Sequence, residues 1–354
     1  STQAKTLFPY TTLFRSVSQN NLFVGTNAGL YDIEELATYG VDNTIFSADG
    51  FQNNITGYSN TGIGSGVLKA NGTGYGNTAL GYLCLNKNTS GFLNTAGGTG
   101  ALSSVTYGAY NTAFGGNALA GLTTAISCIA LGVNALANCN TNYNIGIGSN
   151  TLGEVGFTGT HNNIIGIDAG RYATTATYCQ GMGYETFFHL TTGNYNDCMG
   201  HQGFREIGTG AQNAGLGGQV FANLVNGSDN VGLGFRAGNT QTAGNGNIVI
   251  GSQSALPSTT GSNQLNLGNA IYGNLTSSTL GVAPSAYVHL KAGTTAAGTA
   301  PLKLTSGSLN TTPEVGAFEF LTDKLYFTIT TGAVRKEISF GAGSSYTPGS
   351  VLFA

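Results

Sequence analysis

Few residues of this chain have both the type and the spacing that chemistry needs. Asp168, Glu185 and Asp197 are the carboxylates that could form a pair, and hydrolysis of a glycosidic bond needs two such groups across a cleft. The three lie in separate units of a repeated sequence, so only the winding of the chain could bring them together. The four histidines include no pair spaced for a metal. The sequence therefore predicts no catalytic residue, no metal site and no cofactor.

The five cysteines give a similar result. They are Cys84, Cys128, Cys139, Cys179 and Cys198, and they occupy four different phases of the repeat. Only Cys128 and Cys179 share a phase, and three sheet spacings of ~4.8 Å each would hold them too far apart to bridge. We interpret the cysteines as small apolar residues of the interior rather than as a disulfide framework or a metal site.

A repeated phrase must position all of these residues. It reads Gly-Tyr-Gly-Asn-Thr-Ala-Leu-Gly at 74–81 and returns as Gly-Ala-Tyr-Asn-Thr-Ala-Phe-Gly at 108–115. We number each repeat from its last glycine as column 0. These glycines are spaced by 17 residues, with one step of 16 and one of 18, at Gly64, Gly81, Gly98, Gly115, Gly132, Gly148, Gly166, Gly183, Gly200, Gly217, Gly234, Gly251 and Gly268. Two looser repeats at Gly25 and Ser47 make 15, and such a period predicts a coil of stacked units.

Column −4 is asparagine in 12 of the 15 repeats. Identical amides one sheet spacing apart can donate and accept along the stack, so we expect a structural hydrogen-bond ladder. Its clearest members are Asn60, Asn77, Asn94, Asn111, Asn144, Asn162, Asn196, Asn213, Asn230 and Asn247.

Four other columns predict how each turn of the coil packs. Column −1 is large and apolar, and column +4 changes from leucine to phenylalanine along the chain, so we expect these two columns to form the core. Column −2 is mostly alanine or glycine, as in Ala96 and Ala113, and we expect it to be a flat outer face on which another copy packs. Column −7 is glycine in 11 repeats, which predicts a turn with positive φ.

Alternation of small and large residues over five positions is typical of a strand and too short for a helix. We therefore predict an all-β fold, a parallel β-solenoid or β-roll of about 15 repeats of 17 residues, each with a strand, a turn, a second short strand and a loop. Residues 30–39 have helical spacing and predict a short excursion from the coil. A small antiparallel β domain follows, predicted from alternating runs such as Lys324-Leu-Tyr-Phe-Thr-Ile.

The expected organisation has five parts. Residues 1–16 are an artefact segment, since Thr6–Ser16 resembles a translated sequencing adapter. Residues 17–273 form the solenoid, 274–286 a linker and 287–345 the small β domain. Residues 346–354 begin a further segment that is cut short.

Composition excludes some partners. Only 8% of the residues are charged, the net charge is −3, and the 12 lysines and arginines form no cluster, so we expect neither nucleic acid nor a membrane as a partner. Columns of aromatic rings are the more promising feature for binding. Tyr110, Tyr143, Tyr178 and Tyr195 share column −5, and Tyr82 and Tyr184 share column +1. They could contact a glycan by stacking on sugars, or they could only pack the coil.

The Asn-Thr-Ala-Leu-Gly units resemble the head repeats of trimeric autotransporter adhesins and, more closely, the shafts of phage tail fibres. The stretches at 263–273, 300–307 and 312–320 resemble the region before a self-cleaving chaperone domain in such fibres. The resemblance implies a homotrimeric fibre, extracellular or on a virion surface, that binds a host glycan or protein receptor. The 17-residue period departs from the shorter period of autotransporter heads.

The leading hypothesis is a non-enzymatic, structural and adhesive fibre segment for host attachment. One alternative is a catalytic tail spike that degrades host polysaccharide, and another is a bacterial autotransporter head. An ice-binding solenoid is suggested by Thr44, Thr61, Thr78, Thr95 and Thr112 in column −3, but that column breaks at Ile129.

Overall fold

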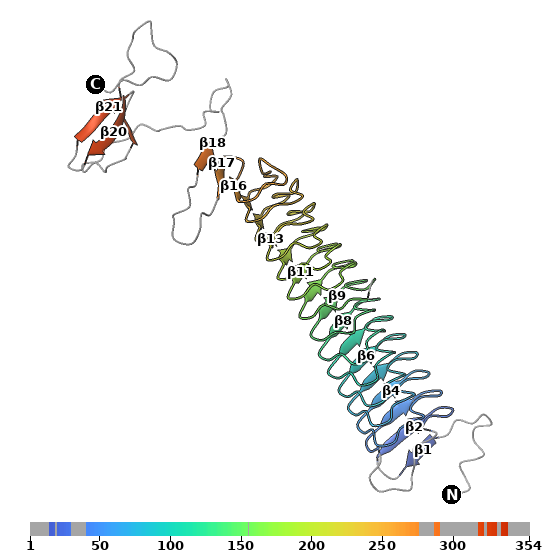
Figure 1. The fold of residues 1–354 in the computed structure, drawn as a ribbon. Coiled ribbons are helices and arrows are strands. Elements are labelled where there is room, and N and C mark those ends of the chain that lie inside the picture. Colours follow the sequence, from blue (N-terminus) through green and yellow to red (C-terminus); the bar gives the residue numbers. More distant parts are fainter. Residues whose placement is uncertain are drawn as a thin grey trace, which may run out of the picture. The chain divides into compact units, whose positions relative to one another are not determined.

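The computed structural model describes residues 14–17, 20–29, 40–154, 156–275, 287–290, 318–321, 324–330 and 334–338. The chain divides into two units, Ser1–His289 and Leu290–Ala354. The first contains the coil, which Figure 1 shows as a stack of similar turns from β2 to β16. The expected helical excursion at 30–39, the artefact segment at 1–13, most of the linker and the segment at 346–354 lie outside the described residues.

The coil is a parallel β-solenoid, as the sequence predicts. Each strand from β2 to β16 pairs in parallel with the next. The pairing follows the repeat, including Leu131↔Ile147 at the short step and Ile147↔Ile165 at the long one. The strands are β2 (Asn21–Val24), β3 (Thr44–Phe46), β4 (Thr61–Ile63), β5 (Thr78–Leu80), β6 (Thr95–Gly97), β7 (Thr112–Phe114), β8 (Ile129–Leu131), β9 (Ile145–Ile147), β10 (Asn163–Ile165), β11 (Gln180–Met182), β12 (Asp197–Met199), β13 (Ala214–Leu216), β14 (Val231–Leu233), β15 (Ile248–Ile250) and β16 (Gln264–Leu267).

Two strands pair antiparallel at the ends of this sheet. β1 (Phe14–Val17) pairs with β2, and β17 (Ile271–Asn274) pairs with β16. A further strand, β18, spans Tyr287–Leu290. In the second unit, β19 (Phe318–Leu321), β20 (Lys324–Thr330) and β21 (Val334–Ile338) form a three-stranded antiparallel sheet. This sheet is the described part of the expected small β domain.

Each full turn from β4 to β15 has one regular strand of three residues, not two strands as expected. Left-handed residues bend the rest of the turn. Gly81 in column 0 has φ +133°, and a Cβ there would lie 2.7 Å from the carbonyl oxygen of Gly98 in the next turn. Leu85 in column +4 is also left-handed, with φ 51°. This conformation is costly for leucine, but it turns the side chain into the interior, where it is fully buried.

The middle residue of each strand, in column −2, points into the coil, and the first and third point outward. The expected core at column −1 is therefore wrong, and so is the expected outer face at column −2. Ala96 and Ala113 are buried, whereas Leu80 in column −1 is 52% exposed. Only column +4 forms the core as predicted, and Phe187, Phe204 and Phe221 stack there with ring centroids 6.2 and 5.7 Å apart.

The narrow interior explains the small residues of column −2. A Cβ on Gly181 would lie 2.8 Å from the ring of Phe187 in column +4, so the two columns fill one space. In several turns a large residue in column −2 accompanies a small one in column +4, although Ile45 and Phe51 are both large and both buried. Ile164 accompanies Gly170, and Val249 accompanies Ala255. This exchange of volume keeps the interior filled from turn to turn.

The asparagines of column −4 are buried and joined from turn to turn. Asn94 Nδ2 donates to Asn77 Oδ1 at 3.1 Å and to the Gly108 carbonyl at 2.8 Å. Asn94 Oδ1 accepts from the backbone N–H and from Nδ2 of Asn111. An amide with asparagine in the turns on both sides, such as Asn94, thus has its oxygen and both Nδ2 hydrogens paired without water. This pairing removes the cost of burying the amide.

The ladder has two interruptions. Cys128 and Cys179 replace asparagine in column −4. Their backbone N–H groups still donate to the preceding amides, Asn111 and Asn162, but they offer no oxygen to the next turn. The ladder therefore consists of three blocks.

Most glycines of column −7 differ from their prediction, and only Gly40 and Gly244 have the expected positive φ. Gly74 does not have positive φ, but a Cβ there would lie 2.4 to 2.5 Å from the amides of Asn71 and Asn88 and from the Gly91 carbonyl. Glycine is needed at this point because side-chain amides and the next turn approach the backbone closely.

Candidate functional site

The outer side of the strands presents a row of large apolar side chains along the coil. We call columns −3 and −1 of β3 to β15 the strand face. Nine of its 13 column −1 side chains are exposed by 38 to 53%, and they are Phe46, Ile63, Leu80, Phe114, Met182, Met199, Leu216, Leu233 and Ile250. Leu131, Ile147 and Ile165 are partly buried, and Gly97 has no side chain. An exposed apolar surface that recurs in so many turns is typical of an interaction site.

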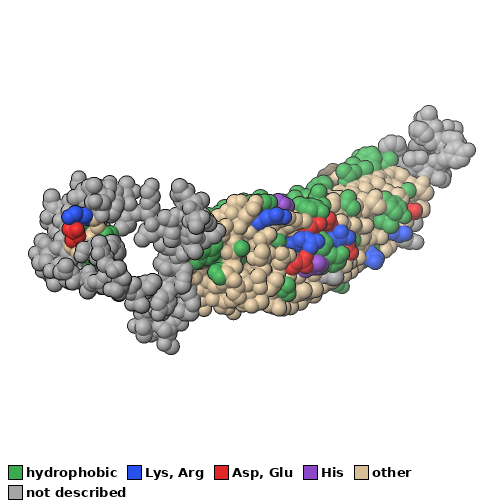
Figure 2. Space-filling view, turned by 90° about the horizontal axis from the view of Figure 1, so that it is seen from above, with side chains coloured by type: hydrophobic (Ala, Val, Ile, Leu, Met, Phe, Trp, Pro, Cys, Tyr) green, Lys and Arg blue, Asp and Glu red, His purple; other side chains and the backbone are tan. Residues whose placement is uncertain are grey.

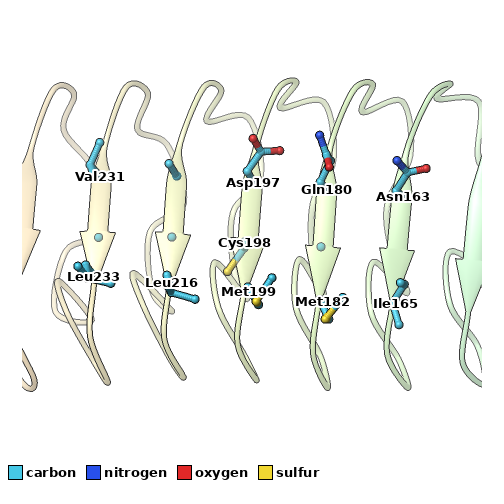
Figure 3. Close-up of a pocket in the computed structure, with 14 residues that line it drawn as sticks. Asn163, Ile165, Gln180, Met182, Asp197, Cys198, Met199, Leu216, Val231 and Leu233 are labelled. Atoms are coloured by element: carbon cyan, nitrogen blue, oxygen red, sulfur yellow. The ribbon is translucent and has the colours of Figure 1, made fainter.

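A shallow groove of about 620 Å³ runs along the strand face from β10 to β14. Figure 3 shows two parallel rows of side chains on these strands. One row begins with Asn163, Gln180 and Asp197, and the other consists of Ile165, Met182, Met199, Leu216 and Leu233. The groove is therefore mainly apolar with a short polar edge.

Asp197 is the one charged residue of the strand face. Burial raises the pKa of its carboxyl group, and a hydrogen bond from the backbone of Gln180 opposes the shift. A carboxylate at this point disfavours any partner that removes it from water. The strand face should therefore bind an apolar partner better when Asp197 is protonated.

The predicted tyrosines of column −5 form part of an exposed aromatic stack. Tyr143, His161, Tyr178 and Tyr195 follow one another with ring centroids 4.8 to 5.1 Å apart. His161 belongs to the stack although it was not among the predicted contacts. Tyr110 lies apart from these four rings and meets Phe92 edge to face at 5.3 Å.

Stacking limits what these rings can bind. The faces of His161 and Tyr178 are covered by their neighbours, so only their edges face solvent. Tyr195 is 56% exposed and ends the run of ring contacts. A sugar ring that needs an open aromatic face would find it at the end of the stack.

The two tyrosines of column +1, Tyr82 and Tyr184, are exposed but lie six repeats apart. Tyr184 hydrogen-bonds Glu185. The six predicted tyrosines therefore lie in separate places along the coil and form no single binding site.

A charged cluster lies on another part of the surface, where Figure 2 shows side chains of both signs together. Arg205 pairs with Glu185 at 2.9 Å and with Glu206, and its guanidinium lies 4.7 Å from the ring centroid of Phe188. His189 Nδ1 lies 2.6 Å from Glu206 Oε2. Arg171 similarly joins Glu154 and Asp168. The opposite charges satisfy one another within the cluster.

The carboxylates that could have served a hydrolase are not brought together. Asp197 lies on the strand face, whereas Asp168 and Glu185 lie in column +2, each paired with an arginine. Burial raises the pKa of Glu185, but hydrogen bonds from Arg205, Tyr184 and Gln202 outweigh it and lower the pKa to about 2. A group that is ionised down to such a pH is a poor general acid.

A second, exposed ladder runs along column +2 and was not predicted from the sequence. Asn117 donates to Asn134, Asn134 to Asn150 and Asn150 to Asp168, at 3.4, 3.2 and 3.0 Å. Gln219 continues the pattern later by donating to Gln202 at 2.8 Å. The run of amides in one phase was the available signal.

Among the described residues, no group of three or more histidine, cysteine, aspartate or glutamate side chains is placed to hold a metal ion. The described part of the chain also has no helix with the length and apolar character of a membrane span. No family model, curated protein or solved structure matches this chain.

Proposed function

We propose that the chain is a non-enzymatic, structural and adhesive fibre segment whose copies associate through the strand face. The observation that carries this proposal is the row of exposed apolar side chains in column −1, which recurs in nine of the 13 strands from β3 to β15. A solenoid of paired amides and filled interior supplies a stiff support. The fibre would be extracellular or on a virion surface, in line with the resemblance of its repeats to phage tail fibres and adhesin heads.

The dimensions of the strand face suit association between copies. Twelve spacings of ~4.8 Å and strands of ~10 Å give a footprint of roughly 600 Å². A standard interface buries about 800 Å² on each partner, so the strand face supplies most of that area. A second copy in parallel repeats every column at the same spacing. The number three comes from the resemblance, and we propose a parallel homotrimer.

The test is the mass of the assembly in solution. We expect the intact protein to sediment as a trimer at micromolar concentration. The double variant Leu80→Glu, Leu216→Glu should sediment as a monomer, because it places charges on the strand face. The matched control Ile55→Glu, Val225→Glu changes residues of similar exposure in column +8 and should remain a trimer. A monomeric wild-type protein would contradict the proposal.

We further propose that attachment to a host glycan or protein receptor uses the exposed aromatic rings, with Tyr195 at the end of its stack as the first candidate. Tyr195→Ala should weaken binding to bacterial surface polysaccharides on an array, while Tyr110→Ala serves as the comparison from the separate run of Tyr58, Tyr75, Phe92 and Tyr110. Release of reducing ends from any of these polysaccharides would instead favour a catalytic tail spike.

A further inference from the structure

A second column of asparagines lies beside the ladder and explains why two cysteines of this chain meet. In the first repeats, column +7 is also asparagine, and the two columns converge on one carbonyl group. Asn60 Nδ2 and Asn71 Nδ2 donate to the Gly74 oxygen at 2.9 and 3.0 Å. Asn77 and Asn88 share the Gly91 oxygen at the same distances. Side chains in these two columns therefore meet although they are 11 residues apart in the sequence.

One turn has cysteine in both positions. Cys128 replaces the asparagine of column −4, and Cys139 occupies column +7. Their sulfur atoms lie 3.1 and 3.6 Å from the same oxygen, the Thr141 carbonyl, which takes the place of the Gly74 oxygen. Both cysteines are fully buried. Cys179 also stands in column −4, but its column +7 neighbour is Leu190, so this convergence of sulfurs does not recur there.

The two thiols also interact with each other. A hydrogen bond from Cys128 lowers the pKa of Cys139, against the effect of burial, and the same hydrogen bond raises the pKa of Cys128. The two sulfur atoms are therefore neighbours in the folded coil, which is the arrangement that a disulfide between them needs.

We propose that Cys128 and Cys139 form an intramolecular disulfide that closes the turn between β8 and β9. This is the one turn shortened to 16 residues, and it is also where the asparagine ladder is first interrupted. A covalent bond there joins two points of this one turn, where the cysteine at 128 offers no amide oxygen to the next turn. The inference concerns the coil itself and stands whether or not the chain serves as a fibre.

The bond forms by exchange with a low-molecular-weight disulfide such as oxidised glutathione. The thiolate of one cysteine attacks one sulfur of that disulfide, forms a mixed disulfide and expels one glutathione thiolate. The thiolate of the other cysteine then attacks the protein sulfur of the mixed disulfide and expels the second. The protein loses two electrons and two protons, and the reagent gains them as two thiols. Because both sulfurs are buried in the folded coil, the exchange takes place before this turn closes.

The test is to refold the intact chain in a buffer of oxidised and reduced glutathione, denature it, and label free thiols with iodoacetamide. We expect three labels, on Cys84, Cys179 and Cys198, against five after reduction. Digestion after Leu131 or Leu136 should give two peptides joined by a bond between Cys128 and Cys139. Five labels after oxidative refolding, or a bond to any other cysteine, would overturn the proposal.

Two variants separate this bond from general effects of cysteine removal. Cys139→Ala should restore labelling of Cys128, whereas Cys84→Ala, a buried cysteine of column +3, should keep the Cys128–Cys139 bond. Oxidation should raise the melting midpoint of the wild type and of Cys84→Ala, and leave that of Cys139→Ala unchanged. An equal rise in all three proteins would show that the bond does not hold this turn.

Discussion

Replacing Asn94 by alanine tests the buried ladder directly. The change removes the oxygen that accepts from the backbone N–H and from Nδ2 of Asn111, at 3.1 and 3.0 Å. It also removes the donor to the Gly108 carbonyl at 2.8 Å. These three buried groups lose a partner, whereas Asn77 Oδ1 loses the Asn94 Nδ2 donor but keeps the Asn94 backbone N–H. At about 1 kcal/mol or more for each of the three, the free energy of unfolding should fall by about 3 kcal/mol or more.

The matched control is Asn53→Ala, which removes the same side chain at an exposed position after β3. It should change the free energy of unfolding by less than about 0.5 kcal/mol. Denaturant melts give both values, and hydrogen exchange should show faster exchange of the Asn111 amide proton in Asn94→Ala alone. Equal losses of stability in the two variants, or an unchanged Asn111 exchange rate, would refute the reasoning.

Three further predictions concern packing and charge. Leu102→Ala empties a fully buried position and should cost about 2 to 5 kcal/mol in denaturant melts, whereas Leu80→Ala on the strand face should cost less than about 1 kcal/mol at dilutions that give a monomer. The pKa of Glu185 is lowered from 4.5 to about 2, so the stabilisation by its carboxylate is present above pH 4.5 and is lost as the pH falls toward 2. Glu185→Gln should therefore make the melting midpoint less dependent on pH over that range. Burial raises the pKa of Asp197 above 3.8, so its favourable contribution is present below that pH and is lost as the pH rises. Asp197→Asn should therefore raise the melting midpoint at pH 7, and a lower midpoint would contradict this.

The repeat predicted the architecture because its period and its column of asparagines leave few ways to stack. An amide at a fixed phase, such as Asn94, pairs with the amide one turn away, and this needs no knowledge of the rest of the turn. Alternation within a three-residue strand shows that Ala79 and Leu80 face opposite ways. It does not show which of them faces inward.

Residue size suggested the wrong side for that strand. The interior is narrow and already holds column +4, so it accepts the small residue and excludes the large one. The signal was present in the exchange between Ile164 and Gly170. The contact between Cys128 and Cys139 was missed for a related reason, because comparing one phase with itself cannot find a contact between two different columns.

The interruptions of the ladder at Cys128 and Cys179 have a mechanical consequence. A chain pulled from its ends should not unwind one turn at a time, because turns within a block share amide bonds that turns across an interruption lack. The length of the chain should therefore increase in steps, with pauses at the two interruptions. At each pause, the next block should still be folded under the applied force. A disulfide between Cys128 and Cys139 would keep the residues between them from extending. One step of the extension should therefore be shorter under oxidising conditions and return to its full length after reduction.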